Sequence, residues 1–394
     1  MRPAALRLAA FAALADAAAA RAARAARCEG LAEWLYESAD WAPPGYHVLC
    51  ADSGTGSTSF ELFRGGHSGR KVQWDSKISS MSSLRKQLEK KAHMEPQEMW
   101  KVLPWLLADT SGVPVQDLSA VQGLLLLFEG GRWVWPGIRE GFQRRVALPT
   151  AGEEMNVTLK ALTLDPLSFT IEDFFDKASA ERMIKLAKPK LRPAEIMTQD
   201  SQKENVEDLG VEVRTCWETW LSPKDGPDLE NVAQRSAALV RVPRELQADF
   251  RVLRYEPGQH FGAHTDYYEP EDFQEQPEVL NELQNGRNWL VTVYLYLSTV
   301  AKGGATYFPS SYGGPLPSDV LKCEGPAVKP RRGRALMFYS LHPNGRPNLS
   351  SMHGACKVEK GVKYTINIWT FNQLKPEFNG NAKKGKGEKR PNEL

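Results

Sequence analysis

An imidazole and a carboxylate lie two positions apart at the end of the segment Tyr255-Glu-Pro-Gly-Gln-His-Phe-Gly-Ala-His264-Thr-Asp266. The segment follows a predicted strand, and side chains two positions apart on a strand point to the same face. His264 and Asp266 could therefore supply two ligands to one metal ion. A lone pair of this kind is more often a hydrogen-bonded pair at the surface, so the metal interpretation requires a third ligand.

His353 is the best candidate for that third ligand. The other histidines fit less well, because they lie outside the strand-rich half, on the opposite strand parity or in a turn: His47, His67, His93, His260 and His342. His353 lies just before the last predicted strand. Two histidines and one carboxylate, with the remaining coordination positions open, form the ligand set of non-haem Fe(II) oxygenases.

Lys363 opens the last predicted strand, ten residues after His353. Alternation places one set of side chains on one face, Lys363, Thr365, Asn367 and Trp369, and a second set on the other, Tyr364, Ile366 and Ile368. Alternation alone favours a solvated lysine on an exposed face. The presence of His353 and Trp369 nearby favours instead a buried Lys363, whose ammonium group would need an anion such as a dicarboxylate cosubstrate.

The elements that must position these residues are predicted strands in the second half of the chain. They are Leu167–Glu172, Phe250–Glu256, Trp289–Leu297, Ala335–Tyr339 and Lys363–Phe371, with a helix over Lys177–Ala187. Long polar loops separate these strands, which predicts an antiparallel sandwich or barrel rather than a doubly wound sheet. No Gly-x-Gly-x-x-Gly motif follows a strand, which argues against a nicotinamide cofactor.

Residues 28–150 are predicted to form a small α+β N-terminal region, whose sequence does not indicate a function. Ser79–Met94 and Pro96–Leu107 have helical spacing of apolar residues, Val115–Phe128 fits a helix followed by a buried strand, and Ala51–Ser59 fits a turn. Gly, Pro and acidic residues mark a boundary before the catalytic domain, which is expected over residues 155–375. A basic tail follows over residues 376–394.

Composition excludes several classes of protein. The chain has 394 residues with 50 Lys plus Arg against 48 Asp plus Glu, and this balance argues against a nucleic-acid binder. None of the five cysteines belongs to a Cys-x-x-Cys motif, which argues against a zinc ribbon and a thioredoxin-type redox pair. The hydrophobic fraction of 42% is sufficient for a large core.

Residues 1–27 combine five arginines with an alanine-rich apolar stretch from Leu8 to Ala20. This composition fits a secretory signal or an organelle transit peptide, and an alanine-rich surface helix is the alternative. No other segment has the roughly 18 apolar residues of a membrane span. We therefore expect a mature chain without a transmembrane span.

Motifs in the second half occur in a fixed order. They are Arg214-Thr215, then Tyr255 to Asp266, Tyr296-Leu-Ser298, Gly303-Gly-Ala-Thr-Tyr-Phe-Pro309, Gly333-Arg-Ala-Leu-Met-Phe-Tyr339, Met352-His353-Gly-Ala-Cys356, and Gly361-Val-Lys363 with Trp369. With this set, residues from about 167 to 371 resemble the catalytic domain of the 2-oxoglutarate- and Fe(II)-dependent prolyl 4-hydroxylases, both collagen-type and plant or algal. Each motif is degenerate, but the ordered set covers about half of the chain and is specific.

The resemblance implies a mainly β fold with flanking helices, a double-stranded β-helix or jelly roll. It implies iron ligation by His264, Asp266 and His353, and binding of the distal carboxylate of 2-oxoglutarate by Lys363, with Tyr255 and Thr365 as hydrogen-bonding neighbours. The reaction would couple hydroxylation by O₂ to decarboxylation of 2-oxoglutarate to succinate, with ascorbate as reductant. Asp266 matters, because a small residue there would open a site for halide and indicate halogenation instead.

Departures from the family pattern fall around the substrate. Arg214-Thr215-Cys216 replaces a frequent Arg-Thr-Ser, and an arginine expected after Asn288 is displaced to Arg287. We expect Arg214, Arg287 and Trp369 to line the substrate groove, with a solvated arginine or a core tryptophan as the alternative for each.

The resemblance also bears on the cysteines and on location. Cys323 and Cys356 match a cysteine pair of plant and algal relatives, and a disulfide there would brace the loop that presents His353. Cys28 and Cys50 could form a second bond, leaving Cys216 free. Such bonds need an oxidising compartment. With the terminal Pro-Asn-Glu-Leu as a loose retention-type signal, this favours the endoplasmic reticulum lumen or the secretory pathway, and a plastid or mitochondrion is the alternative.

The leading hypothesis is a procollagen-proline 4-dioxygenase-like enzyme that acts on proline in peptides or proteins. One alternative is a 2-oxoglutarate oxygenase acting on another residue or a small molecule. A second is a peptide-binding protein with a decayed oxygenase domain. Asn156-Val-Thr and Asn348-Leu-Ser are possible glycosylation acceptors. The sequence does not indicate an oligomeric state.

Overall fold

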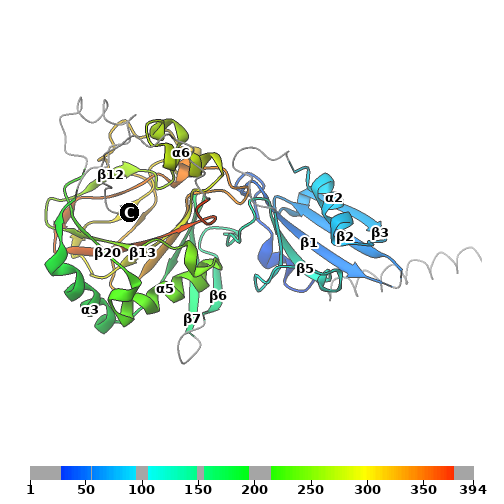
Figure 1. The fold of residues 1–394 in the computed structure, drawn as a ribbon, viewed down its shortest axis with the longest axis horizontal. Helices are drawn as coiled ribbons and strands as arrows, with labels where there is room; N and C mark the ends of the chain where they lie inside the picture. Colours follow the sequence, from blue (N-terminus) through cyan, green and yellow to red (C-terminus); the bar gives the residue numbers. More distant parts are fainter. Residues whose placement is uncertain (1–27, 55, 95–104, 149–154, 195–213, 377–394) are drawn as a thin grey trace, which may run out of the picture.

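The computed structural model of the chain describes residues 28–54, 56–94, 105–148, 155–194 and 214–376. The expected signal or transit peptide and almost all of the basic tail lie outside these residues. The described chain is elongated, with one sheet at one end and a larger assembly of strands at the other (Figure 1). Among the described residues, no helix combines the length and apolar character needed to cross a bilayer.

The N-terminal region is one antiparallel sheet with strand order β3-β2-β1-β5-β4. Its elements are β1 (Tyr46–Ser53), β2 (Thr58–Arg64), β3 (Lys71–Ser76), α2 (Met81–Ala92), β4 (Leu106–Asp109) and β5 (Gly123–Phe128). Leu84 and Leu88 of α2 pack with Leu49 and Leu62 of the sheet. Ser80 caps α2, because its side chain accepts a hydrogen bond from the Ser83 amide.

Of the three helices expected here, one is correct and a second is reduced to a single turn. Ser79–Met94 contains α2, and Val115–Phe128 contains a short 3₁₀ turn, Leu118–Ala120, followed by β5. The helix expected over Pro96–Leu107 is wrong at its described end, where Leu106 begins β4. A short buried strand and one turn of a buried helix have similar apolar patterns, and pairing with β5 decides in favour of the strand.

The second half of the chain folds into a jelly roll, as expected. In the described part of the chain, a nine-stranded sheet has the order β6-β7-β8-β17-β13-β20-β11-β10-β9, and a four-stranded sheet has the order β12-β18-β15-β16. The strands of the large sheet are β6 (Gln143–Leu148), β7 (Met155–Leu164), β8 (Leu167–Ile171), β9 (Arg192–Pro193), β10 (Trp217–Leu221), β11 (Phe250–Tyr255), β13 (Trp289–Tyr296), β17 (Ala335–Tyr339) and β20 (Lys363–Phe371). Those of the small sheet are β12 (Phe261–His264), β15 (Thr306–Tyr307), β16 (Ala327–Val328) and β18 (His353–Ala355).

The chain passes back and forth between the two sheets. It runs from β11 in the large sheet to β12 in the small one, returns to β13, crosses to β15 and β16, returns to β17, crosses to β18 and ends in β20. A further two-stranded antiparallel sheet is formed by β14 (Lys302–Gly303) and β19 (Val358–Lys360), which are far apart in sequence.

Helices cover the outer side of the large sheet. They are α3 (Lys177–Ala187) and α5 (Pro227–Val240), while α6 (Pro277–Gln284) lies at the rim (Figure 1). The helix α3 agrees with the sequence prediction, and α5 and α6 were not predicted. Both carry a signal for a helix start, a proline at the first helical position, and α5 adds buried Leu229, Val232 and Ala233 on one side.

The expected boundary near residue 150 falls inside a hairpin. β6 pairs with β7 along their lengths, so strands on both sides of residues 149–154 belong to the large sheet. The hydrophobic core is also continuous, because buried residues before and after this point, such as Val48 and Val291, belong to one cluster, and the Trp135 indole donates to the Leu239 carbonyl of α5 at 2.7 Å. The division into domains at this point stays a prediction.

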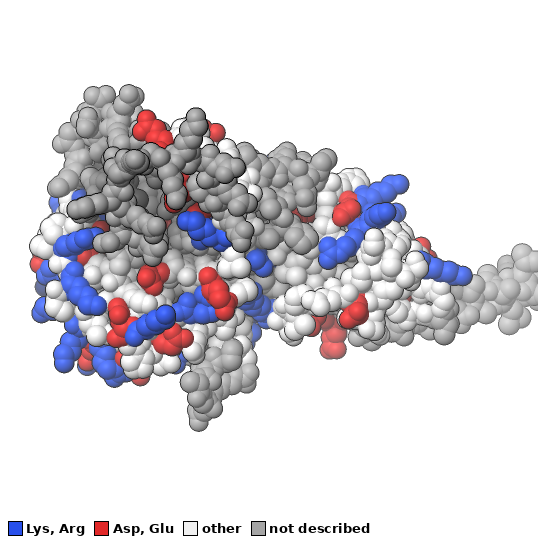
Figure 2. Space-filling view, in the orientation of Figure 1, with Lys and Arg blue, Asp and Glu red and all other residues white. Residues whose placement is uncertain are grey.

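Charges of both signs are interspersed on the face of the molecule shown in Figure 2. This distribution follows from the nearly equal numbers of acidic and basic residues. Exposed ion pairs such as Arg331 with Glu172 belong to this mixed surface, and pairs of this kind contribute little to stability.

Candidate active site

The three predicted metal ligands meet where the small sheet faces the large one. His264 ends β12 and His353 begins β18, and the two residues are direct partners in the antiparallel pair. Asp266 follows two residues after His264. One ligand atom from each of the three side chains lies within 4.8 Å of the others. In the sequence His353 lies 87 positions after Asp266, and strand pairing brings the three residues together.

Both imidazoles present the same nitrogen to this cluster. His264 Nδ1 lies 2.9 Å from the Gly262 carbonyl oxygen, and His353 Nδ1 lies 3.0 Å from the Ser351 carbonyl oxygen. A carbonyl oxygen can only accept, so Nδ1 carries the proton in each ring and Nε2 has a free lone pair. Backbone carbonyls therefore fix both the ring orientation and the tautomer that a metal needs.

The carboxylate of Asp266 is also held in place. Its Oδ2 accepts a hydrogen bond from the Thr292 hydroxyl of β13 at 2.6 Å. Its oxygens lie 4.0 Å from His264 Nε2 and 3.9 Å from His353 Nε2. These separations are too long for hydrogen bonds, and they leave room for an ion about 2 Å from each ligand atom. The donor set and its spacing therefore fit Fe(II) with other positions open.

His264 is kept neutral by its surroundings. Loss of solvent, followed by the proximity of His353, lowers the pKa of His264 to about 3. The Phe261 ring stacks on the His264 imidazole with 3.9 Å between the ring centroids, and the Arg214 guanidinium lies 4.6 Å from the centroid of the Phe261 ring. This stack adds a second constraint on the position of the imidazole.

Lys363 lies deep between the sheets with no exposed surface. Its Nζ has no hydrogen-bond partner among the described residues and is surrounded by the rings of Tyr255, Tyr294 and Tyr296, at 5.1, 5.5 and 5.8 Å. Burial lowers the pKa of Lys363 to about 7. An unpaired ammonium in such a place is costly, and a bound carboxylate would remove the cost.

The side chains of β20 alternate between two buried faces, as predicted. Ile366 and Ile368 lie in the hydrophobic core. The other face carries buried polar atoms without hydrogen-bond partners in the described chain: Lys363 Nζ, Asn367 Oδ1 and Trp369 Nε1. Thr365 is fully buried in the same row, and Tyr255 is paired with Lys363 across β11 and β20. A row of unsatisfied polar atoms beside a metal cluster is what a polar ligand would complete.

The three residues expected in the substrate groove occupy different surroundings. Arg214 is buried in an ion pair with Glu218 at 2.7 Å. Arg287 pairs with Glu282 and lies over the Phe371 ring. These contacts give both arginines a role in the scaffold, and substrate contact by either stays a prediction. Trp369 belongs instead to an aromatic group with Trp220 and Trp289, at 5.9 and 5.8 Å between ring centroids.

The cysteines pair as the sequence suggested. Cys323 is bonded to Cys356, three residues after His353, and Cys28 is bonded to Cys50. Cys216 is free and buried. It clusters with Tyr255 beside the lysine pocket, and the Arg214 Nε lies 3.3 Å from its sulfur.

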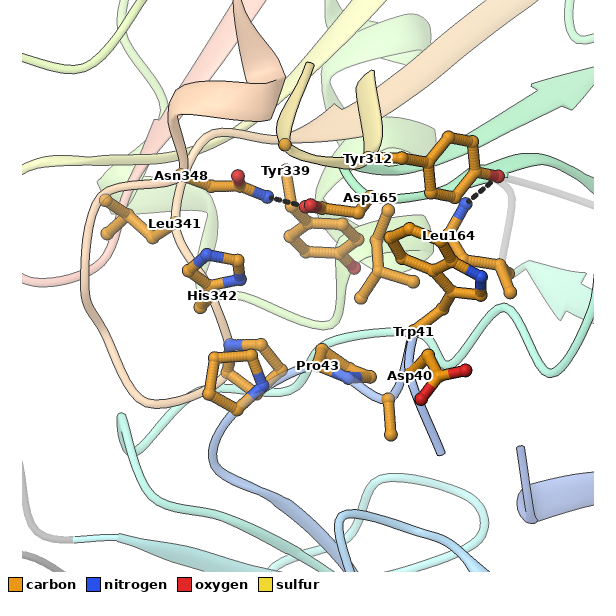
Figure 3. Close-up of a pocket in the computed structure, with 15 residues that line it drawn as sticks. Asp40, Trp41, Pro43, Leu164, Asp165, Tyr312, Tyr339, Leu341, His342 and Asn348 are labelled. Carbon is orange, nitrogen blue, oxygen red and sulfur yellow. Dashed lines mark hydrogen bonds between the residues drawn. The ribbon is translucent and has the colours of Figure 1, made fainter. Parts of the chain in front are cut away.

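A separate cavity of about 250 Å³, whose lining includes none of the three metal ligands, is shown in Figure 3. It lies between the segment 40–44 of the N-terminal region and the loops of the jelly roll that carry Asp165, Tyr312 and Asn348. Asn348 is 4% exposed and donates to Asp165, so the expectation that it could carry a glycan is wrong for the folded chain.

The residues that the sequence did not reveal are those that hold the ligands. They are Thr292, Phe261 and the carbonyls of Gly262 and Ser351. Gly262 and Phe261 belong to the motif that contains His264, so a local role could have been suspected. Thr292 lies 26 residues from its partner on another strand, and no spacing rule connects the two.

Comparison with known proteins gives the class. Residues 250–371 match the model of the 2OG-Fe(II) oxygenase superfamily. Probable prolyl 4-hydroxylase 4 of Arabidopsis thaliana is 32% identical over 222 residues, which are 54% of this chain and 69% of the relative. Prolyl 4-hydroxylase 13 of the same plant is 31% identical, over 55% of this chain and 76% of the relative.

Solved structures give a weaker likeness. One of these structures is the viral collagen prolyl hydroxylase of Paramecium Bursaria Chlorella virus-1 in complex with 2OG. The alignment covers 52% of the present chain and 95% of the viral chain. The TM-score of this alignment is 0.37 and the sequence identity is 19%.

The jelly roll, the His/Asp/His cluster and the family match define a 2-oxoglutarate- and Fe(II)-dependent dioxygenase. Within that class, the chain belongs to the prolyl 4-hydroxylase family, because it is similar to a relative over more than two thirds of the relative's length.

We expect Thr292→Val to weaken metal binding while leaving the fold intact. Valine has nearly the same shape but cannot donate to Asp266, and loss of such an outer partner lowers metal affinity about 10- to 100-fold. Titration of the metal-free protein with Co(II), followed by visible absorption, measures the effect. Thr370→Val is the control, because the buried Thr370 hydroxyl has no partner in the described chain. Equal affinities of the two variants would contradict the role of Thr292.

Proposed function

We propose that the protein hydroxylates proline residues in extended polypeptides, using Fe(II), 2-oxoglutarate and O₂. The observation that carries this proposal is the row of buried, unpartnered polar atoms on β20, which runs from Lys363 to Trp369 beside the His/Asp/His cluster. The row has a cation at one end for a dicarboxylate and an aromatic group at the other for a substrate.

Each group has a task that its surroundings support. His264, Asp266 and His353 would hold the iron, and Lys363 would pair with the distal carboxylate of 2-oxoglutarate. Tyr255 and Thr365 would line the cosubstrate pocket. When bound, iron with the 2-oxo acid and O₂ supplies the oxidising power to hydroxylate an unactivated C–H bond. The protein must then orient the substrate carbon and keep water out, and the buried tyrosines around Lys363 provide a dry wall.

The aromatic group formed by Trp220, Trp289 and Trp369 supports a proline-containing substrate. Proline-rich segments adopt the polyproline II conformation, which leaves the rings and carbonyls exposed for recognition. Aromatic grooves bind such segments in several unrelated domains. The Trp369 indole N–H is buried without a partner in the described chain, and a peptide carbonyl is a suitable acceptor.

We propose a location in the endoplasmic reticulum lumen or elsewhere in the secretory pathway, with ascorbate as the reductant. The two disulfides, Cys28–Cys50 and Cys323–Cys356, support this location because such bonds persist in oxidising compartments. Import into a plastid or mitochondrion is the alternative.

Mass spectrometry of proline-rich peptides incubated with the enzyme, Fe(II), 2-oxoglutarate and ascorbate tests the proposed reaction. The expected product gains one oxygen atom on proline, with one succinate released for each oxygen added. His353→Ala should abolish both products, because two ligands remain where three are needed. Succinate release that no proline peptide stimulates would contradict the prolyl substrate and favour another residue or a small molecule.

The pH dependence of cosubstrate binding tests Lys363. The free lysine has a pKa of about 7, and pairing with a carboxylate raises it, so binding above pH 7 takes up a proton. The apparent dissociation constant of 2-oxoglutarate should therefore rise about fivefold between pH 7 and pH 8. Lys363→Arg should remove this dependence, because a guanidinium stays charged in this range. The same slope in both proteins would exclude Lys363 as the titrating group.

A further inference from the structure

Asp165 holds the loop that leads to His353. It is the first residue of the turn between β7 (Met155–Leu164) and β8 (Leu167–Ile171), far from the metal cluster in sequence. Its Oδ1 accepts a hydrogen bond from the Asn348 side-chain amide at 2.8 Å, drawn as a dashed line in Figure 3. Its Oδ2 accepts from the Ser350 hydroxyl, also at 2.8 Å. One carboxylate thus accepts hydrogen bonds from two residues of the same loop.

The loop that contains Asn348 and Ser350 continues directly to His353 of the metal cluster. Asn348 begins a 3₁₀ turn, Leu349–Ser351, and its Oδ1 accepts from the Ser350 amide at 3.0 Å. The carbonyl of Ser351, the last residue of the turn, accepts from His353 Nδ1 at 3.0 Å. A continuous chain of hydrogen bonds and short backbone therefore joins the Asp165 carboxylate to the ring of His353.

We propose that Asp165 is a positioning residue for His353, and that the pair Asp165–Asn348 sets the metal affinity of the site. The proposal rests on the proposed ligation of iron by His353. Asp165 touches neither the metal cluster nor the lysine pocket by any contact found among the described residues. It acts through the Ser351 carbonyl, which fixes the tautomer and the angle of the imidazole.

Three features make Asp165 a strong restraint on the loop. Hydrogen bonds to a carboxylate are stronger than those between neutral groups. Two bonds to residues two positions apart restrain both the place and the rotation of the loop. Asp165 is itself fixed, because its carbonyl accepts from the Tyr312 amide at 2.8 Å, and the neighbouring Gly313 amide donates to the Ser350 hydroxyl at 3.1 Å.

The loop needs such a restraint from outside the small sheet. β18 has three residues, and its first, His353, is the ligand itself. The disulfide at Cys356 anchors the chain after His353, whereas Asp165 anchors it before. Metal ligation tolerates only about 0.2 Å in ligand distance, so loosening one anchor should reduce affinity before it disturbs the fold.

Exchange of the two side chains gives the sharpest test. Asn348→Asp sets two carboxylates against each other, and Asp165→Ala removes both bonds to the loop. The double variant Asp165→Asn/Asn348→Asp restores the pair in reverse. The new amide at position 165 donates to the new carboxylate at position 348, and the amide oxygen at position 165 still accepts from the Ser350 hydroxyl. We expect each single variant to bind Co(II) about 10- to 100-fold more weakly than the wild type, and the double variant to recover to within about threefold.

Co(II) titration of the metal-free protein, with chemical unfolding of each variant in parallel, separates positioning from simple stability. Asp117→Ala is the control, because Asp117 is exposed and makes no side-chain bond to its turn. Ser350→Ala, which removes one of the two bonds, should give an intermediate loss and serves if a stronger variant fails to fold.

Three results would overturn the inference in distinguishable ways. Single variants that unfold more easily but bind Co(II) like the wild type would show that Asp165 is only structural. A double variant as weak as the single ones would exclude the pair as the cause. A wild-type protein that binds no metal would instead overturn the ligand assignment itself, and this inference with it.

Discussion

An ammonium group buried without an anion is the constraint on which the rest of the site depends. Lys363 has no exposed surface, and its Nζ has no partner in the described chain. Burying a charge in this way is unfavourable unless a counter-charge arrives. The charged form of Lys363 is therefore favoured by an acidic ligand, and the lowered pKa of about 7 reflects burial in the absence of such a partner. Under the proposed function, a 2-oxo dicarboxylate would pair with the lysine at one end and occupy open metal positions with the other.

The jelly roll makes this arrangement possible by placing the lysine and the metal ligands on facing sheets. Lys363 belongs to the large sheet, whereas His264 and His353 belong to the small one. Asp266 is linked back to the large sheet through Thr292. The two sheets are thus joined through the site itself, so changes in their packing would alter the distance between the metal cluster and Lys363.

Much of this could be predicted from the sequence, and the omissions have a physical pattern. Strand parity grouped His264 with Asp266, the shortage of histidines singled out His353, and alternation gave the inward row that begins at Lys363. Such features depend on local periodicity. Thr292 and Asp165 were missed because their contacts join residues far apart in sequence, which no spacing rule reveals. The ion pairs of Arg214 and Arg287 were missed for the same reason, since an arginine in a scaffold and one in a groove have the same sequence signature.

The most direct test of the account is the anomalous diffraction of a crystal grown with Mn(II) and 2-oxoglutarate. The account predicts one strong peak between the Nε2 atoms of His264 and His353 and the Asp266 carboxylate, with the distal carboxylate of 2-oxoglutarate at Lys363 Nζ. A metal bound elsewhere, or a 2-oxoglutarate whose carboxylates both lie away from Lys363, would contradict it.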